Sequence, residues 1–97
     1  MTRAPRRPPA RPSRNPYVRA LARVMKVQRE GLFISQAAAA ASILMPQPHW
    51  CRIESGRQKD VAISTFVGIA AALRFRAADL MALVESEIRS RPSEYTA

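Results

Sequence analysis

Three polar side chains near the middle of the chain, Gln47, His49 and Arg52, could do recognition chemistry. An arginine can donate two hydrogen bonds to the major-groove edge of guanine, and a glutamine can make a matching pair of bonds with adenine. Each such contact discriminates against a wrong base by about 1–3 kcal/mol. Residue types of this kind, gathered in one short segment, have the chemistry to contact nucleic-acid bases.

His49 and Cys51 are the one histidine and the one cysteine of the chain, so they also suggest a metal site or a nucleophile. A structural zinc ion takes about four ligands, and a nucleophilic dyad needs a third group that orients the base. The sequence offers no such set, no paired carboxylates and no glycine-rich phosphate loop. We therefore expect no enzyme activity, no cofactor and no bound metal.

The charge of the chain points to a polyanionic partner. Sixteen lysine and arginine residues against seven acidic residues give a net charge of +9 over 97 residues. Nucleic acid is the first candidate partner. An anionic membrane is the second, although no apolar run approaches the ~20 residues of a spanning helix. A single cysteine suits a reducing compartment, so we expect a cytoplasmic protein associated with the nucleoid and no membrane partner.

Composition divides the chain into three parts. Residues 1–16 have five prolines, no acidic residue and five arginines, namely Arg3, Arg6, Arg7, Arg11 and Arg14. Such a segment cannot bury a core, so we expect a disordered basic arm, either a solvated tail or a cationic strap for phosphates or the minor groove. Residues 17–90 should form one folded domain, followed by a C-terminal tail over 91–97.

Hydrophobic spacing predicts an all-α domain of five helices without strands. They are expected at about residues 17–29, 36–44, 48–55, 61–73 and 77–88. The bulky residues at 31–34 should fill the core between the first two helices. Glu54 should pair with one of three basic residues of the first helix, Arg23, Lys26 or Arg29.

The segment from 35 to 56 should form two helices joined by a turn. Ser35 can cap the first of them by accepting a hydrogen bond from a free amide, which is worth ~1 kcal/mol. A residue that precedes proline avoids the α region, so we expect Gln47 to be non-helical and the second helix to begin at Pro48. On this second helix Trp50 and Ile53 should face the core, while His49 and Arg52 face solvent.

With these elements placed, residues 17–88 resemble the lambda-repressor and Cro type (XRE type) of helix-turn-helix DNA-binding domain. The matching features are SQ at 35–36, Ala40, RIESG at 52–56 and IAAALRFRAADLM at 69–81. The resemblance implies a compact five-helix, lambda-repressor-like fold in which the helix at about 48–55 lies in the major groove.

The resemblance also implies roles by position. Base edges would be contacted by Gln47, Pro48, His49 and Arg52. The DNA backbone would be contacted by Ser35, Gln36, Arg57 and Lys59. Proline offers no donor, so Pro48 would contribute apolar contact only. Leu44 stands where the family usually has glycine, so we expect either another path for the turn or inward packing of Leu44 without a positive φ.

These features predict a sequence-specific regulator of transcription, a repressor or activator of bacterial or phage type that binds double-stranded DNA. We expect a homodimer, because one short helix contacts few base pairs. Control would come through concentration, a regulatory protein partner or competition at overlapping sites. The shared surface would be Leu80, Leu83, Val84 and Ile88, unless these residues close the monomer core. The alternatives are an antitoxin that regulates its own promoter and a nonspecific nucleic-acid-binding protein driven by the arm.

Overall fold

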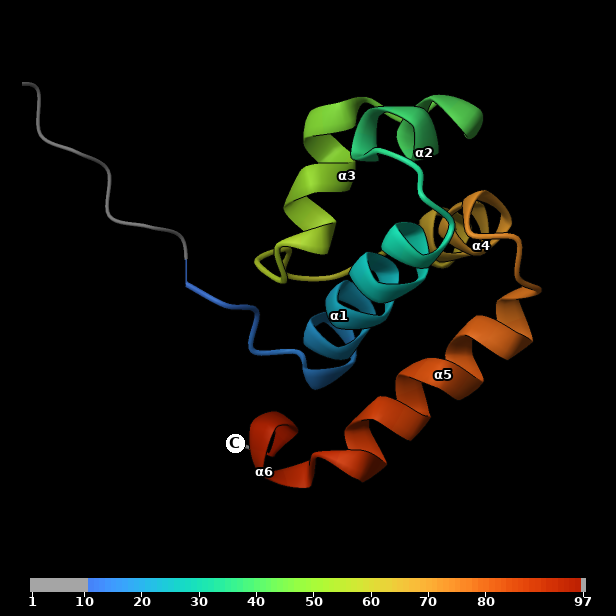
Figure 1. Ribbon diagram of the computed structural model, residues 1–97. Coiled ribbons are helices and arrows are strands. Elements are labelled where there is room, and N and C mark those ends of the chain that lie inside the picture. The colour runs from blue at the N-terminus through green and yellow to red at the C-terminus, as the bar shows by residue number, and fades with distance from the viewer. Residues whose placement is uncertain (1–10, 97) are drawn as a thin grey trace, which may run out of the picture.

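The computed structural model describes residues 11–96, which form six α-helices and no strand (Figure 1). The helices are α1 (Pro16–Gly31), α2 (Gln36–Ser42), α3 (Gln47–Glu54), α4 (Ile63–Ala72), α5 (Ala77–Ser90) and α6 (Pro92–Tyr95). The all-α prediction is confirmed, and α1 to α5 begin and end within two residues of their expected positions. Arg3, Arg6 and Arg7 lie outside the described residues. Within residues 11–96, no helix has the length and apolar character needed to cross a bilayer.

Helix α1 lies at the centre of the fold, with α3 on one side and α5 on the other (Figure 1). Its apolar face, formed by Val18, Leu21, Val24 and Met25, is buried, and so are Ala20 and Ala22 beside it. Ala22 faces the end of α3, since a Cβ built on Gly56 would lie 3.5 Å from the Ala22 Cβ. The small alanines let a second helix approach the centre closely. The core around α1 contains Met25, Trp50, Ile53, Ile69, Leu73, Leu80 and Val84.

Three helices end in the same backbone motif without a glycine. Phe33 after α1, Leu44 after α2 and Arg74 after α4 have φ values of +58°, +55° and +65°. Each of them, and the residue that follows, donates an amide hydrogen bond back to the last turn of its helix, as in a Schellman motif. Phe33 is 96% exposed, so the expectation that residues 31–34 fill the core is wrong for this side chain, whereas Ile34 packs against the core.

A sixth helix, α6, corrects the expectation of an unordered C-terminal tail. Tyr95 is buried against α1 and α5, and the Arg19 guanidinium lies 5.9 Å from the centre of its ring. The Arg23 Nη1 atom lies 2.6 Å from the Glu94 carboxylate. Four helical residues are too few to show a hydrophobic period, so only these long-range contacts reveal the element.

The position of α5 corrects half of the predicted dimer surface. Leu80 and Val84 are 0% and 1% exposed, because α5 packs along α1 and buries both side chains in the monomer core. Leu83 and Ile88 are partly buried against the same core. The alternative, in which Leu80, Leu83, Val84 and Ile88 close the core of the monomer, therefore fits the structure.

Candidate nucleic-acid interface

Helix α2 begins with the predicted serine cap. The Ser35 Oγ atom accepts a hydrogen bond from the Ala38 amide at 3.0 Å, and the Ser35 backbone is extended. Ala39 and Ala40 are buried, and α2 packs against α3. Alanine side chains let the two helix backbones approach closely. Sequence and structure therefore agree on the first half of the two-helix unit.

The turn between α2 and α3 follows neither path expected for Leu44. Its backbone takes the left-handed conformation that glycine favours, and its side chain is 95% exposed rather than packed inward. The Leu44 and Met45 amides donate to the carbonyls of Ala41 and Ala40 at 3.1 and 2.9 Å. These hydrogen bonds hold the turn although a leucine in this conformation costs about 1 kcal/mol or more.

Helix α3 begins at Gln47, one residue before the predicted start. Pro46 has the extended backbone of a residue that flanks a helix, with φ −59° and ψ 135°. Pro48 is then the second helical residue, a position whose amide has no partner within the helix. The expectation that Gln47 is non-helical is therefore wrong, because the first turn of a helix tolerates the proline one position later than expected.

A buried carboxylate fixes α3 to α1. Glu54 Oε2 accepts hydrogen bonds from Trp50 Nε1 at 2.7 Å and from Arg29 Nε at 2.9 Å, and Oε1 accepts from Arg29 Nη2 at 2.7 Å. The Glu54 side chain is 3% exposed and that of Arg29 is 12% exposed. Of the three basic residues expected to pair with Glu54, Arg29 is therefore the one that does.

The environment of Glu54 favours its charged form. Burial by itself raises the pKa of this carboxyl, but the hydrogen bonds from Arg29, Trp50 and Gln36 outweigh burial, so the pKa is lowered. Gln36, which was predicted to contact the DNA backbone, is half-buried and helps to lower the pKa of this internal carboxyl. The group of residues holds α3 by its C-terminal end and leaves the opposite face of the helix to solvent.

The solvent-exposed face of α3 consists of Gln47, Pro48, Cys51 and Arg52. Cys51 follows Gln47 by four positions and Pro48 by three, and Arg52 follows Pro48 by four, so the four residues share one side of the helix. His49 is half-buried, so of the four predicted base-contacting residues it is the one that lies off this face. Cys51 takes the central position, which sequence analysis missed, although its spacing from Gln47 and Pro48 could have revealed it.

Residues 11–15, which we call the strap, lie against the loop after α3. The Ser13 amide donates to the Gly56 carbonyl at 2.8 Å, and Ser13 Oγ donates to the Lys59 carbonyl at 3.2 Å. Arg19 Nη1 donates to the Ser13 carbonyl at 2.6 Å, and Ser13 is 5% exposed. The expectation of disorder is therefore wrong for this part of the arm, because loop carbonyls and Arg19 satisfy its backbone.

The strap brings cations from two distant segments to one surface. Arg11 and Arg14 line a hollow of about 590 Å³ together with Arg57 and Lys59 of the loop. The hollow also contains one acidic residue, Asp60. None of the ion pairs found among residues 11–96 involves Arg11, Arg14 or Lys59. This cationic hollow lies just beyond the C-terminal end of α3 and suits a phosphate-bearing ligand.

Residues 11–96 contain no group of three or more histidine, cysteine, aspartate or glutamate side chains that could hold a metal ion. Comparison of the chain with protein-family models, with curated proteins and with solved structures found no significant match.

Proposed function

We propose that this chain is a sequence-specific DNA-binding regulator of transcription that inserts α3 into the major groove. The observation that carries the proposal is the division of α3 into two faces. One face is fixed to the core through Trp50, Ile53 and Glu54, and the other presents Gln47 and Arg52 to solvent. A rigid helix with an exposed glutamine at its start and an exposed arginine in its last turn suits recognition of base edges.

The charge distribution supports the same ligand. The cationic hollow follows directly on the C-terminal end of α3, so phosphates of a duplex could be neutralised beside a groove that holds the helix. At the other end of the two-helix unit formed by α2 and α3, Ser35 is exposed at the beginning of α2. Contacts to the backbone would set the register of α3, and contacts of its exposed face would supply sequence preference.

The test begins with selection of bound fragments from random duplex DNA, repeated at two salt concentrations. Binding of Arg52→Ala is then compared with wild type on the selected site and on a random duplex, by fluorescence anisotropy. We expect the variant to lose about 1–3 kcal/mol on the selected site and much less on the random duplex. The loss should fall on one or two base positions.

Arg89→Ala is the matched control, because it removes the same charge from an exposed position on α5. It should leave the preference for the selected site unchanged. Equal losses on both duplexes after Gln47 and Arg52 are changed together would contradict direct recognition by α3. Failure of the selection to enrich any sequence would favour nonspecific nucleic-acid binding. The positive charge of the cationic hollow would be sufficient for that activity.

A further inference from the structure

One arginine of α1 joins the two ends of the described chain. Arg19 Nη1 donates a hydrogen bond to the Ser13 carbonyl of the strap at 2.6 Å. Arg19 Nη2 donates to the carbonyls of Glu94 and Tyr95, each at 3.4 Å. The Arg19 guanidinium also lies over the ring of Tyr95. Arg19 is therefore bonded to the strap on one side and to α6 on the other.

The bonds from Arg19 to α6 follow from the way this helix ends. The last four carbonyls of a helix have no amide partner within it, and basic side chains can satisfy them. Glu94 and Tyr95 are the last two residues of α6. A guanidinium carries five N–H donors in a planar fork, whereas a lysine has one compact ammonium. An arginine at position 19 can therefore donate to the strap from one nitrogen and to α6 from another.

Helix α6 is itself held in place. Tyr95 is buried, and its hydroxyl donates to Glu87 Oε1 of α5 at 3.1 Å. The Thr96 amide and hydroxyl both donate to the Pro92 carbonyl, at 2.9 and 2.8 Å. These bonds close the single turn of α6 and join it to α5. Because α6 is fixed, its carbonyls hold the Arg19 guanidinium in one orientation.

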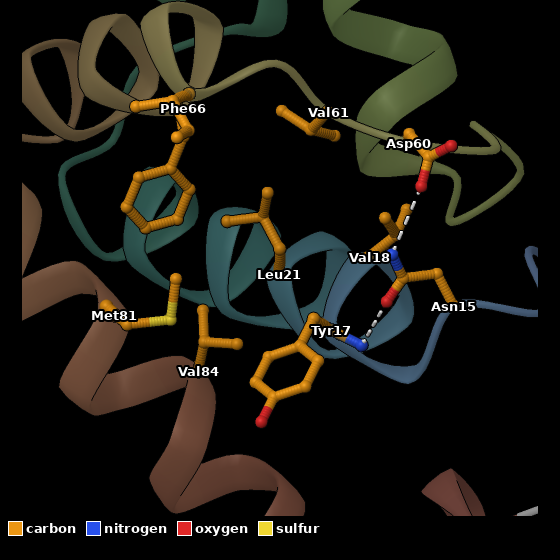
Figure 2. A pocket seen from close by; sticks show the side chains of 10 residues that line it. Asn15, Tyr17, Val18, Leu21, Asp60, Val61, Phe66, Met81 and Val84 are labelled. Carbon is orange, nitrogen blue, oxygen red and sulfur yellow. Dashed lines mark hydrogen bonds between the residues drawn. The ribbon is translucent and has the colours of Figure 1, made fainter.

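The strap is held on its other side by the loop after α3. The Ser13 amide and hydroxyl donate to that loop, and Asn15 Nδ2 does so as well, as Figure 2 shows. Arg11 and Arg14 are exposed and lie within two residues of Ser13. The position of the Ser13 backbone, whose carbonyl Arg19 binds, therefore decides where both strap cations lie.

Loss of the Arg19 contact should move the strap. Ser13 is almost fully buried, so its carbonyl would lose a charged donor and have little access to water. A buried acceptor without a partner is costly in free energy, and the strap would escape that cost by moving its backbone into solvent. Arg11 and Arg14 would then leave the cationic hollow.

We propose that Arg19 is a positioning residue of the cationic hollow, through which α6 holds Arg11 and Arg14 in place for DNA phosphates. The inference rests on the proposed function for its ligand and extends it to the C-terminal helix, which takes no part in the proposed contacts of α3. If Arg19 acted only as a cation that attracts phosphate, lysine would replace it without loss.

The first experiment needs no DNA. Hydrogen–deuterium exchange of the Ser13 amide is followed by NMR in the full chain. Arg19→Gln and Arg19→Lys should each raise the exchange rate at least tenfold, and Tyr95→Ala should do the same because it releases α6. Lys26→Gln is the control, because it removes an exposed cation from the same helix, and it should leave the rate unchanged. Unchanged exchange in Arg19→Gln would overturn the inference whatever the ligand.

A second amide separates a moved strap from a weakened fold. The Ile53 amide lies in the buried part of α3 and should exchange at the wild-type rate in both Arg19 variants. Equal rises at Ser13 and Ile53 would overturn the inference, because they would show a general loss of stability. Circular dichroism melting checks that each variant folds. If Tyr95→Ala does not fold, the Arg19 variants decide the outcome.

The second experiment measures binding to the selected site and to a random duplex over a range of salt concentrations. Arg19→Gln and Arg19→Lys should weaken both complexes equally, by roughly tenfold near 0.15 M salt. The slope of log K against log salt should fall by up to about 1.8, the value for two phosphate contacts. In a chain that already has Arg11→Ala and Arg14→Ala, Arg19→Lys should have no further effect.

These measurements distinguish the role of Arg19 from DNA binding itself. Full affinity in Arg19→Lys, or an equal loss with and without the two strap arginines, would overturn the positioning role and leave the proposed function standing. A wild type that binds no duplex would contradict the proposed function, and with it the contact of the strap with phosphates.

Discussion

The cationic hollow lies beside an apolar groove between the beginning of α1, the loop before α4, and α5. The two share lining residues, but their other lining residues differ in chemistry. Asn15 and Asp60 line both of them, and Asn15 Nδ2 donates a hydrogen bond to Asp60 Oδ1 at 3.3 Å. On one side lie Arg11, Arg14, Arg57 and Lys59, and on the other lie Tyr17, Val18, Val61 and Ile63. The strap with the start of α1 is one segment, and the loop after α3 with the start of α4 is the other. Both change from charged to apolar residues at the hydrogen-bonded pair Asn15 and Asp60.

A shift of a few residues along the chain separates a cationic surface from an apolar one. The strap contributes cations before Asn15, and the helix that follows contributes apolar side chains. The loop after α3 repeats this order around Asp60. Because Ser13 contacts Lys59 and Asn15 contacts Asp60, the cations of the two segments lie together on one side and their apolar side chains lie together on the other.

The largest effect should come from removing the buried carboxylate that fixes α3 to α1. Glu54→Ala leaves Arg29 buried without its carboxylate and should lower the free energy of unfolding by about 3–5 kcal/mol, measured by urea denaturation. Glu85→Ala, on the exposed surface of α5, is the control and should change it by less than about 0.5 kcal/mol. A small loss for Glu54→Ala would show that α3 is held by other contacts.

The same group gives a pH dependence. The folded-state pKa of Glu54 is lowered from its ordinary value of about 4.5, so the folded protein holds this proton less tightly than the unfolded chain does. The resulting stability is fully present above the pKa of the unfolded chain and is lost as the pH falls through the folded-state pKa. Glu54→Ala should lack this component of acid unfolding.

The next largest effect should fall on one hollow alone. Changing Arg11, Arg14 and Lys59 together to alanine should reduce the slope of log K against log salt by roughly 2.7 and weaken DNA binding roughly 100-fold near 0.15 M salt. The matched control changes three exposed cations outside the hollow, Lys26, Arg76 and Arg89. Similar slopes for both triple variants would mean that charge acts without regard to position.

Removing the hydrogen bond between Asn15 and Asp60, which lies between the two hollows, should have a smaller effect. Asn15→Ala removes the Asp60 contact and also the α1 cap, in which Asn15 Oδ1 accepts from the Tyr17 amide at 3.0 Å, so it should cost about 1 kcal/mol. Asn15→Asp keeps the cap but places two carboxylates together. In both variants the Ser13 amide should exchange with deuterium faster than in wild type. Unchanged exchange in Asn15→Asp would show that the strap is held by Ser13 and Arg19 alone.

The smallest effect should lie outside both hollows, at the turn before α3. Leu44→Gly relieves the left-handed backbone and should raise the free energy of unfolding by about 0.5–1 kcal/mol. Leu44→Ala keeps the backbone strain and removes an exposed side chain, so it should change stability little. A gain from both substitutions would contradict the explanation by strain. Neither should affect salt dependence.

Local chemistry made much of α1 to α5 predictable. The Ser35 cap, the inward positions of Trp50 and Ile53 and the choice of Arg29 among three partners for Glu54 agree with sequence analysis or lie within its alternatives. The prediction failed at Phe33 and Leu44, where propensity disfavours the observed backbone. It also failed at α6 and the strap, which are too short to carry a pattern of their own.

The sequence by itself determined that the described chain is helical, where five helices lie and which face of α3 is buried, because periodicity and capping act over a few residues. Only the tertiary structure decided that the strap joins the loop after α3, that Leu80 and Val84 belong to the core and that Ile63 stands beside an apolar groove. These features join residues tens of positions apart in the chain, and no local preference encodes which distant segments meet.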